Sequence, residues 1–154
     1  MSRGLAVMLL AMLTGGSAMA ESVCTQMGCQ SGLQLDVAPD YPWSPGAYFF
    51  DFNLDGAHAV CRGVLPLPPC EQSGLTCDNA AITVLQSGCA MLPENHGFGN
   101  IMIDGAPAKV RVTITRDGAQ LVDKTFAPKY HDIRPNGAQC EPVCRQASAR
   151  LLGQ

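Results

Sequence analysis

Eight cysteines are the residues of this chain best suited to chemistry, because a thiolate can bind zinc and a pair of thiols can form a disulfide. The spacings Cys70-x6-Cys77 and Cys140-x3-Cys144 do not give the close ligand pair at both ends that zinc sites use. An even number of cysteines in an exported chain indicates a disulfide framework. We therefore expect all eight to be bonded in pairs: Cys24, Cys29, Cys61, Cys70, Cys77, Cys89, Cys140 and Cys144.

The segment before the cysteines has the organisation of a cleavable signal peptide. Arg3 supplies a positive charge, residues 5–13 form an uncharged apolar run, and residues 18–20 read Ala-Met-Ala before Glu21. A run of this length forms about 14 Å of helix, which is too short for a hydrocarbon core of roughly 30 Å. We expect cleavage after Ala20 and an exported protein, periplasmic or extracellular, with no membrane span left.

The histidines, serines and carboxylates are the residues that could form a catalytic group. His58, His96 and His131 lie in hairpin or loop sequences, and Ser87 lacks the G-x-S-x-G pattern of a nucleophile elbow. The aspartates concentrate in turn sequences, so no acid and base pair stands out. The sequence predicts a protein that is not an enzyme and has no cofactor or bound metal. A formal net charge of −3 with scattered basic residues also argues against a nucleic-acid partner.

Aromatic residues around Pro42 and Pro45 are the one sequence feature that suggests recognition. A proline-stiffened loop carrying Tyr41 and Trp43, followed by Tyr48, could present a flat apolar surface to an envelope or secreted protein partner. The alternative is that Trp43 folds over one end of the domain and closes its core. The sequence favours the second role and leaves the first open.

The elements that must position these residues are strands. Residues 47–54 and 56–65 alternate around Asp55-Gly56, which suits a two-residue type I′ turn. Counting outward from this turn places the larger residues of one strand against smaller residues of the other and points Cys61 inward. The expected pairs are Leu54 with Ala57, Phe52 with Ala59, Phe50 with Cys61, Tyr48 with Gly63, Asn53 with His58, Asp51 with Val60 and Phe49 with Arg62.

A second hairpin is expected over residues 109–116 and 119–126, around Asp117-Gly118. A two-residue turn would pair Ile114 with Leu121 but would place Asp123 on the apolar face. A three-residue turn with Gly118 as a bulge would instead pair Val112 with Val122 and Arg111 with Asp123. The sequence leaves both registers open.

The overall pattern predicts an all-β fold. Shorter strands are expected at residues 81–85 and 100–103, while residues 143–152 suit either a short helix or an irregular strand. Short strands separated by turn-rich connections indicate a single antiparallel β-sandwich, immunoglobulin-like or related, stapled by disulfides. We expect a signal peptide at 1–20, an N-terminal cysteine-containing segment at 21–46 and the sandwich domain at 47–154.

The most distinctive string is YHDIRPNGAQCEPVC, residues 130–144. With residues 47–61, 65–70 and 85–89, it resembles a group of exported proteobacterial proteins of unassigned function that share a Tyr…Pro-Asn-Gly-x2-Cys-x3-Cys ending on a β domain. The resemblance spans residues 48–144, supports the fold and compartment, and implies no activity. Several such proteins look like lipoproteins, whereas Cys24 lacks the small apolar residues that a lipoprotein peptidase reads.

These observations predict an exported cell-envelope protein with a binding or structural role. A secreted enzyme inhibitor that presents the Pro66–Cys77 loop is the main alternative, and a metal-binding protein is a further one. Eight cysteines admit 105 pairings. Among them we expect Cys70 with Cys77, Cys61 with Cys89, and a tie between the chain ends through the remaining four cysteines.

Overall fold

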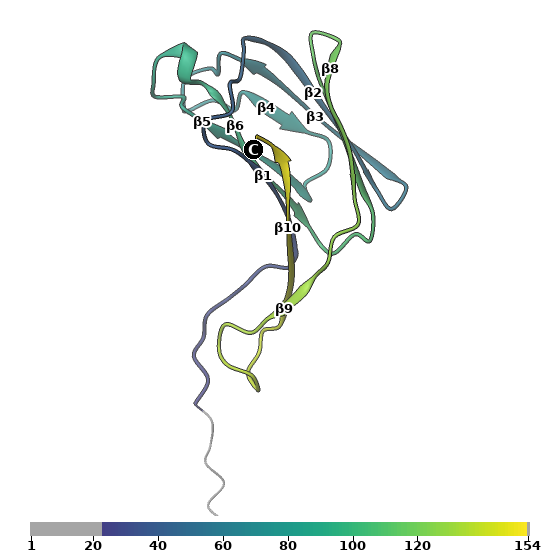
Figure 1. The fold of residues 1–154 in the computed structure, drawn as a ribbon. Coiled ribbons are helices and arrows are strands. Elements are labelled where there is room, and N and C mark those ends of the chain that lie inside the picture. The colour runs from purple at the N-terminus through teal and green to yellow at the C-terminus, as the bar shows by residue number, and fades with distance from the viewer. Residues whose placement is uncertain (1–22, 154) are drawn as a thin grey trace, which may run out of the picture.

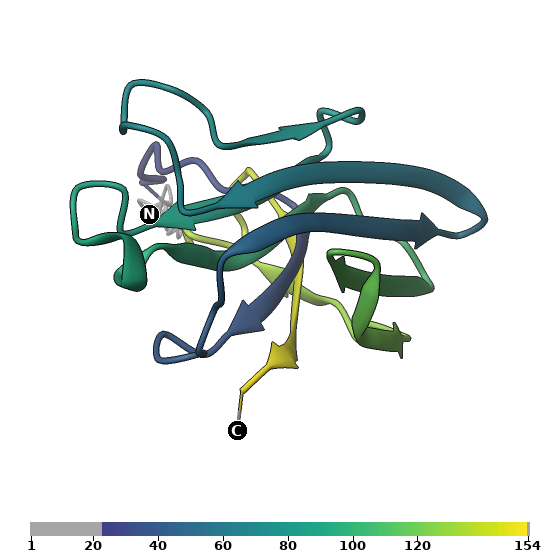
Figure 2. The same ribbon diagram turned by 90° about the horizontal axis from the view of Figure 1, so that it is seen from above.

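The computed structural model describes residues 23–153; the expected signal peptide at 1–20 lies outside these residues. The fold is all-β, with two five-stranded sheets and one short 3-10 helix, η1, at Pro93–Asn95 (Figures 1 and 2). The strands are β1 Gly32–Val37, β2 Gly46–Leu54, β3 Ala57–Leu65, β4 Leu75–Cys77, β5 Ile82–Ser87, β6 Gly97–Asp104, β7 Val110–Arg116, β8 Ala119–Phe126, β9 His131–Ile133 and β10 Cys144–Leu152.

The strands divide between the sheets as follows. Sheet A has the order β5-β6-β1-β10-β9, and sheet B has the order β4-β3-β2-β7-β8. Both sheets contribute one apolar face to a single cluster of buried side chains, including Leu33 and Leu35 from sheet A and Phe50 and Phe52 from sheet B. The alternation of buried and outward residues along strands such as β1 and β2 produces this shared core.

The β2–β3 hairpin has the register that the sequence predicts, from Leu54 opposite Ala57 to Tyr48 opposite Gly63. Asp55 and Gly56 both have positive φ angles, 51° and 96°, as a type I′ turn requires. The Asp55 carboxylate also accepts hydrogen bonds from the backbone N–H groups of Ala108 and Lys109, at 2.9 and 2.7 Å. The turn residue therefore fixes the chain at the entry to β7 as well as its own hairpin.

The β7–β8 hairpin follows neither expected register along its whole length. Asp117-Gly118 forms a two-residue turn with Arg116 opposite Ala119, as one alternative predicts, but a bulge then sets Val122 opposite Ile114. The expected pairing of Leu121 with Ile114 is therefore wrong, and so are the pairings of Val112 with Val122 and of Arg111 with Asp123. The bulge lets Val122 enter the core while Asp123 stays on the outer face.

The bulged register still brings Arg111 and Asp123 into contact. Asp123 lies opposite Thr113, and Arg111 reaches it diagonally with two hydrogen bonds of 2.8 and 2.7 Å. The Arg111 guanidinium holds the pKa of the Asp123 carboxyl below its usual value, chiefly through this hydrogen bonding. Both side chains lie at the surface, so solvent screens the pair.

Sheet A is not purely antiparallel, which corrects the expected arrangement. β1 pairs with β10 in parallel and with β6 in antiparallel fashion. β1 and β10 run the same way because both begin at the end of the domain where their preceding segments are bonded together. β1 itself comes from the segment 21–46 that the sequence sets apart from the sandwich, yet it pairs with β6 and β10.

The sequence predicts the shorter strands less accurately than it predicts the β2–β3 hairpin. β5 and β6 are present, but both are longer than the expected strands at 81–85 and 100–103. Residues 144–152 form a strand, β10, between β1 and β9, with a register shift at Leu151 in its pairing with β1. β4 and β9 have three residues each, which is too short for a periodic pattern to predict them.

Candidate functional site

The four disulfides divide into two pairs, one at each end of the molecule. At one end the bonds are Cys61–Cys77 and Cys70–Cys89, which shows that the expected pairings of Cys70 with Cys77 and of Cys61 with Cys89 are wrong. Cys77 lies on β4 directly opposite Cys61 on β3, so strand pairing brings these two together. Cys70, in the loop before β4, is then left to bond Cys89 in the loop after β5.

At the other end, Cys24 bonds Cys140 and Cys29 bonds Cys144, so these four cysteines join the two ends of the domain as expected. We call this region, residues 23–31 and 134–145, the terminal clamp. It projects below the two sheets in Figure 1. Within residues 23–153 no cysteine is free, which leaves no thiolate available to a metal ion.

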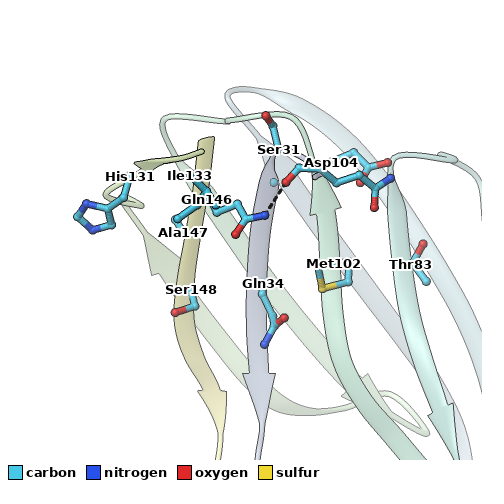
Figure 3. A pocket seen from close by; sticks show the side chains of 12 residues that line it. Ser31, Gln34, Thr83, Met102, Asp104, His131, Ile133, Gln146, Ala147 and Ser148 are labelled. Carbon is cyan, nitrogen blue, oxygen red and sulfur yellow. Dashed lines mark hydrogen bonds between the residues drawn. The ribbon is translucent and has the colours of Figure 1, made fainter. Parts of the chain in front are cut away.

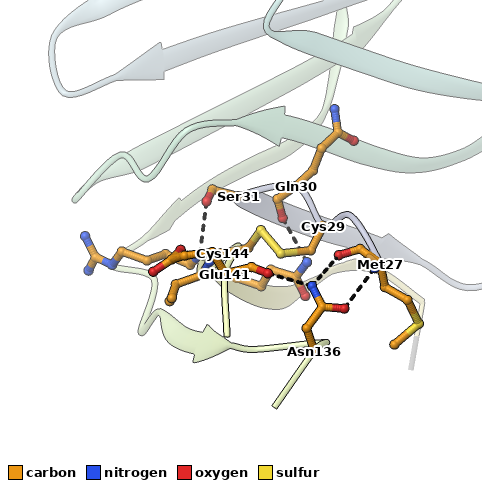
Figure 4. Close-up of a disulfide and its surroundings, with 10 residues drawn as sticks. Met27, Cys29, Gln30, Ser31, Asn136, Glu141 and Cys144 are labelled. Carbon is orange, nitrogen blue, oxygen red and sulfur yellow. Dashed lines mark hydrogen bonds between the residues drawn. A yellow bond between two sulfur atoms is a disulfide. The ribbon is translucent and has the colours of Figure 1, made fainter. Parts of the chain in front are cut away.

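Asn136 is the polar centre of the terminal clamp and is almost fully buried (Figure 4). Its side-chain oxygen accepts hydrogen bonds from the Thr25 hydroxyl and the Met27 N–H, at 2.6 and 2.8 Å. Its amide nitrogen donates to the carbonyl oxygens of Met27 and Glu141, at 2.9 and 2.7 Å. Three of these bonds join Asn136 to the N-terminal segment, and the fourth lies within the 134–145 loop. Asn136 therefore holds the N-terminal segment against this loop.

Three loops gather at the opposite end, and we call them together the loop end: residues 38–45, 66–74 and 88–96. The disulfide Cys70–Cys89 joins the second loop to the third. Trp43 of the first loop packs so closely on Gly97 that a Cβ atom there would lie 2.4 Å from the indole ring. The loops therefore form one connected surface, with the loop that contains η1 at the upper left of Figure 1.

His96 fixes the third loop from inside. Its side chain is buried, its Nδ1 accepts a hydrogen bond of 2.9 Å from the Leu67 N–H, and its Nε2 lies 3.1 Å from the Met91 carbonyl oxygen. Because Nδ1 accepts, Nε2 carries the proton and donates to Met91. Both ring nitrogens have partners within the protein, so His96 acts as a structural link between two loops of the loop end.

Met91 and Leu92 form the tip of the third loop and are exposed to 61% and 64%. The backbone around them is well fixed: the Met91 N–H donates to the Gly88 carbonyl oxygen, and the Asn95 N–H donates to that of Leu92. Two large apolar side chains thus stand in solvent on a loop held by a disulfide, a buried histidine and a 3-10 turn. We call these two residues the apolar tip.

Tyr41 and Trp43 have a packing role that the structure makes explicit. Trp43 makes edge-to-face contacts with Tyr41, Tyr48 and Phe98, with ring centroids 4.8, 5.4 and 5.2 Å apart. Trp43 therefore covers the end of the core while one side of it remains accessible. A hollow of about 580 Å³ lies between this aromatic loop and the third loop.

The composition of the loop end is distinctive. It contains seven of the eleven prolines of the chain, three carboxylates and no lysine or arginine. The prolines are Pro39, Pro42, Pro45, Pro66, Pro68, Pro69 and Pro93. The carboxylates are Asp40, Glu71 and Glu94. Restricted φ angles make these loops stiff, and the unbalanced carboxylates make their surface acidic.

A second concave region lies on the outer face of sheet A. It is an open groove of about 680 Å³, crossed by β5, β6, β1 and β10 and bordered by β9 and residues 30–31 (Figure 3). Its lining is rich in amide and hydroxyl groups, and the only charged or titratable side chains among its lining residues are Asp104 and His131. No sequence pattern marks this groove, because its lining residues come from five strands that only the sheet brings together.

The remaining two histidines lie on different sheets, His58 on β3 and His131 on β9. His58 is exposed, with Nε2 3.1 Å from the Asn53 amide nitrogen and Nδ1 3.5 Å from Asp51. His131 is exposed on β9. Within the part of the chain that the structure describes, no three His, Cys, Asp or Glu side chains are grouped to hold a metal ion. Nor does any helix among these residues have the length and hydropathy to cross a membrane.

No protein-family model, curated protein or solved structure matches this chain. The four disulfides suggest an oxidising environment outside the cytoplasm. The fold and the surface features must therefore support any assignment of function directly.

Proposed function

We propose that this protein is an exported, immunoglobulin-like β-sandwich that serves as a binding module and docks onto a protein partner through its loop end. The signal-peptide pattern of residues 1–20 supports export, and the disulfides agree with it. Two five-stranded sheets that share one core support the sandwich assignment. The binding role accords with loops clustered at one end of such a domain, which is where many β-sandwiches bind.

One observation carries the proposal: the apolar tip is both strongly exposed and held in place. Exposing two large apolar side chains is unfavourable in water, at about 25 cal/mol for each Å² left uncovered. A flexible loop could relieve this by folding Met91 and Leu92 inward, but the Cys70–Cys89 disulfide and His96 oppose that movement. A rigid apolar tip is suited to fill a pocket on a partner at a small cost in conformational entropy.

The surroundings of the apolar tip define the chemistry of that partner. The loop end offers three carboxylates and no cation, so the partner is expected to carry basic groups around an apolar pocket. Attraction between the rims would speed association and would weaken as salt screens it, with a Debye length of about 8 Å at physiological ionic strength. The partner is an envelope or secreted protein, because it must share the oxidising compartment.

Site-specific photo-cross-linking in the native cell tests the proposal. A photoreactive residue in place of Leu92 is expected to give one saturable cross-linked product, which the further change Met91→Ser is expected to reduce. The same group in place of Leu121, exposed to 37% on β8, is the matched control and is expected not to give that product. An identical product from both positions, or none from position 92, overturns the proposal.

The assignment of affinity to the apolar tip is then tested with the purified partner. Met91→Ser/Leu92→Ser is expected to weaken binding by at least tenfold without lowering the melting temperature, because both side chains already face water. Leu121→Ser is the control for the loss of an exposed apolar side chain. If the tip variant binds as well as the unmodified protein, the interaction lies elsewhere.

An enzyme inhibitor is a second candidate, supported by the frame around the Pro66–Cys77 loop. Cys77 is bonded to Cys61 and Cys70 to Cys89, so the loop is anchored near both ends while Glu71, Gln72 and Ser73 stay exposed. Rigid loops of this kind suit inhibition, because little entropy is lost on binding. Inhibition of an enzyme in a panel of secreted proteases, lost on shortening residues 71–73, would favour this candidate over a non-inhibitory adaptor.

Export itself has a direct test. N-terminal sequencing of the protein recovered from the periplasm or medium is expected to begin at Glu21. Retention in the cytoplasm with Met1 intact would contradict the assignment of compartment.

A further inference from the structure

We propose that the groove on the outer face of sheet A binds a neutral oligosaccharide. This site is distinct from the loop end and does not depend on the function proposed for it. Figure 3 shows side chains from several strands of sheet A along the same groove.

Strand register places the central groups of the groove in a row across the sheet. Gln34 on β1 lies directly opposite Ser148 on β10 and Met102 on β6. Met102 lies in turn opposite Thr83 on β5. The row therefore presents a hydroxyl, a thioether, an amide and a second hydroxyl across four adjacent strands, spaced by about 4.8 Å.

The next row explains why this face is hollow. Gly32 on β1 lies between Asp104 on β6 and Gln146 on β10, so no side chain fills the space between those two residues. Two strand spacings separate Asp104 from Gln146, which leaves a gap of about 10 Å between their backbones. A ligand lying across this gap could contact both side chains at once.

The polar groups of the groove are partly fixed before a ligand arrives. Gln34 donates its amide N–H to Asp36 at 2.6 Å, and Gln146 donates to the Gln30 carbonyl oxygen at 2.8 Å. Each amide therefore has an oriented side chain with its oxygen left as an acceptor for a ligand. Ser31 accepts a hydrogen bond from the Arg145 N–H at 3.0 Å, which leaves its hydroxyl proton as a donor.

This set of groups matches a polyhydroxylated, uncharged ligand. Amides and hydroxyls both donate and accept, as sugar hydroxyls do, so the two can pair in several arrangements. No lysine or arginine lines the groove, so an anionic ligand finds no fixed counter-charge, and Asp104 is the only carboxylate among the lining residues. Met102 and the half-exposed Ile133 add apolar surface on which the C–H face of a sugar ring can pack.

An extended peptide fits this region less well. Peptides usually bind sheets by adding a strand to an edge. The edges here are blunted: β4 and β9 have three residues each, β5 and β8 are bulged, and Lys124 donates to the Leu151 carbonyl oxygen beside the open edge of β10. The groove lies on the face of the sheet, where side chains and not backbone groups must make the contacts.

The terminal clamp gives the groove a rigid border. Ser31 and Gln30 follow Cys29 directly, and β9 pairs with the start of β10 at Cys144. The Cys29–Cys144 disulfide (Figure 4) therefore fixes the border that Ser31 and β9 form at the top of the groove in Figure 3. A preformed site loses little conformational entropy on binding, which suits the weak individual contacts that sugars make.

Isothermal titration calorimetry of the oxidised protein with cellohexaose, maltohexaose, laminarihexaose and chitohexaose tests the inference. At least one is expected to bind with a millimolar or lower Kd. Gln34→Met keeps the length of the side chain but removes its amide, and it is expected to weaken that binding about tenfold. Ser148→Ala is expected to weaken it by a smaller factor.

Thr125→Ala, on the exposed edge strand β8 of sheet B, is the matched control and is expected to leave the Kd unchanged. Melting temperatures of all variants establish that they fold. Binding to none of the four saccharides, or binding that Gln34→Met leaves unchanged in a folded protein, overturns the inference. The inference is also overturned if a neutral hexapeptide made of Gly, Ser and Gln binds in the groove and no saccharide does. That result would assign the site to peptides.

Discussion

The terminal clamp is held by two disulfides, and two others anchor the loop end, one between its loops and one between the strands that flank residues 66–74. The two pairs of bonds have different effects. At the loop end, Cys61–Cys77 and Cys70–Cys89 close short stretches of chain, with separations of 16 and 19 residues. In the terminal clamp, Cys24–Cys140 and Cys29–Cys144 close loops of 116 and 115 residues that include nearly the whole domain. The first pair shapes a surface, and the second pair holds the two ends of the fold together.

Chain entropy turns this difference into energy. Closing a loop of about 115 residues restricts the unfolded chain by about 5 kcal/mol, and closing one of 16 to 19 residues by about 3 kcal/mol. The clamp bonds also overlap in sequence, because each has one cysteine inside the loop that the other closes. Once Cys29–Cys144 has formed, Cys24–Cys140 closes only the short path through the first bond. When one clamp bond is missing, the other therefore still provides most of the stabilisation that the two provide together.

Removing both clamp disulfides is expected to have the largest effect. Serine at all four clamp cysteines should lower the free energy of unfolding by about 7 kcal/mol, whereas loss of Cys24–Cys140 alone should cost about 3 kcal/mol. Denaturant unfolding measured by circular dichroism checks both values. If the single and the fourfold variants lose equal stability, the two clamp bonds do not support each other in this way.

Removing the loop-end disulfide is expected to have an intermediate effect on stability and a greater effect on binding. Cys70→Ser/Cys89→Ser should cost about 3 kcal/mol, because it frees a loop of 19 residues. The third loop should also become mobile around the apolar tip, which hydrogen exchange of the Met91 and Asn95 amides would detect. Unchanged protection at these amides would show that His96 and η1 suffice to hold the loop.

Asn136→Ala probes the clamp without touching a disulfide. It removes four hydrogen bonds and leaves their partners in a partly buried site, so we expect a loss of about 2 kcal/mol. Asn136→Asp keeps the acceptor but sets a charged oxygen against the carbonyl oxygens of Met27 and Glu141, so its loss near neutral pH is expected to exceed that of Asn136→Ala. A difference in thermal unfolding between the two variants checks this order, and equal losses would contradict the assigned roles of the two side-chain atoms.

Tyr130 is expected to give the smallest effect, visible mainly in alkali. Its hydroxyl donates to the Pro107 carbonyl oxygen at 3.0 Å, and burial is the main cause that raises its pKa above the usual value. The folded state thus favours the neutral phenol. The stability it contributes is full below about pH 10, the pKa of an unfolded tyrosine, and is lost as the pH rises through the higher folded value.

Tyr130→Phe tests this sign by comparison with the unmodified protein. The variant should be about 1 kcal/mol less stable at pH 8, and this difference should shrink above pH 10. Denaturation midpoints across this range give the difference directly. A gap that widens with pH would mean that the ionised phenolate is the favoured form in the fold.

The two regions also differ in how much of them the sequence predicts. The tie between the chain ends follows from cysteines at both ends of an exported domain, but the role of Asn136 does not, because its four partners lie up to 111 residues away. At the loop end the sequence identifies the proline-rich loops and Trp43 but mispairs all four cysteines. The pairings there depend on β4, a strand of three residues with no periodic signal.

Local chemistry determined the features that the sequence alone predicts. The Asp-Gly turns and the alternating residues beside them specify the β2–β3 register, because side-chain direction reverses at every residue of a strand. The same alternation in Leu33, Leu35 and Val37 would have revealed β1 had it been followed into the N-terminal segment. For these elements, neighbours in sequence are sufficient.

The tertiary structure decided what depends on distant partners. The parallel pairing of β1 with β10, the bulge at Leu121, the cysteine pairings at the loop end and the groove across sheet A all arise where separate segments compete for one place in a sheet. Periodicity says which face of a strand is apolar but not which strand lies beside it. The sequence therefore determined the all-β class and the use of its cysteines, and packing decided which surfaces those strands and disulfides present to a partner.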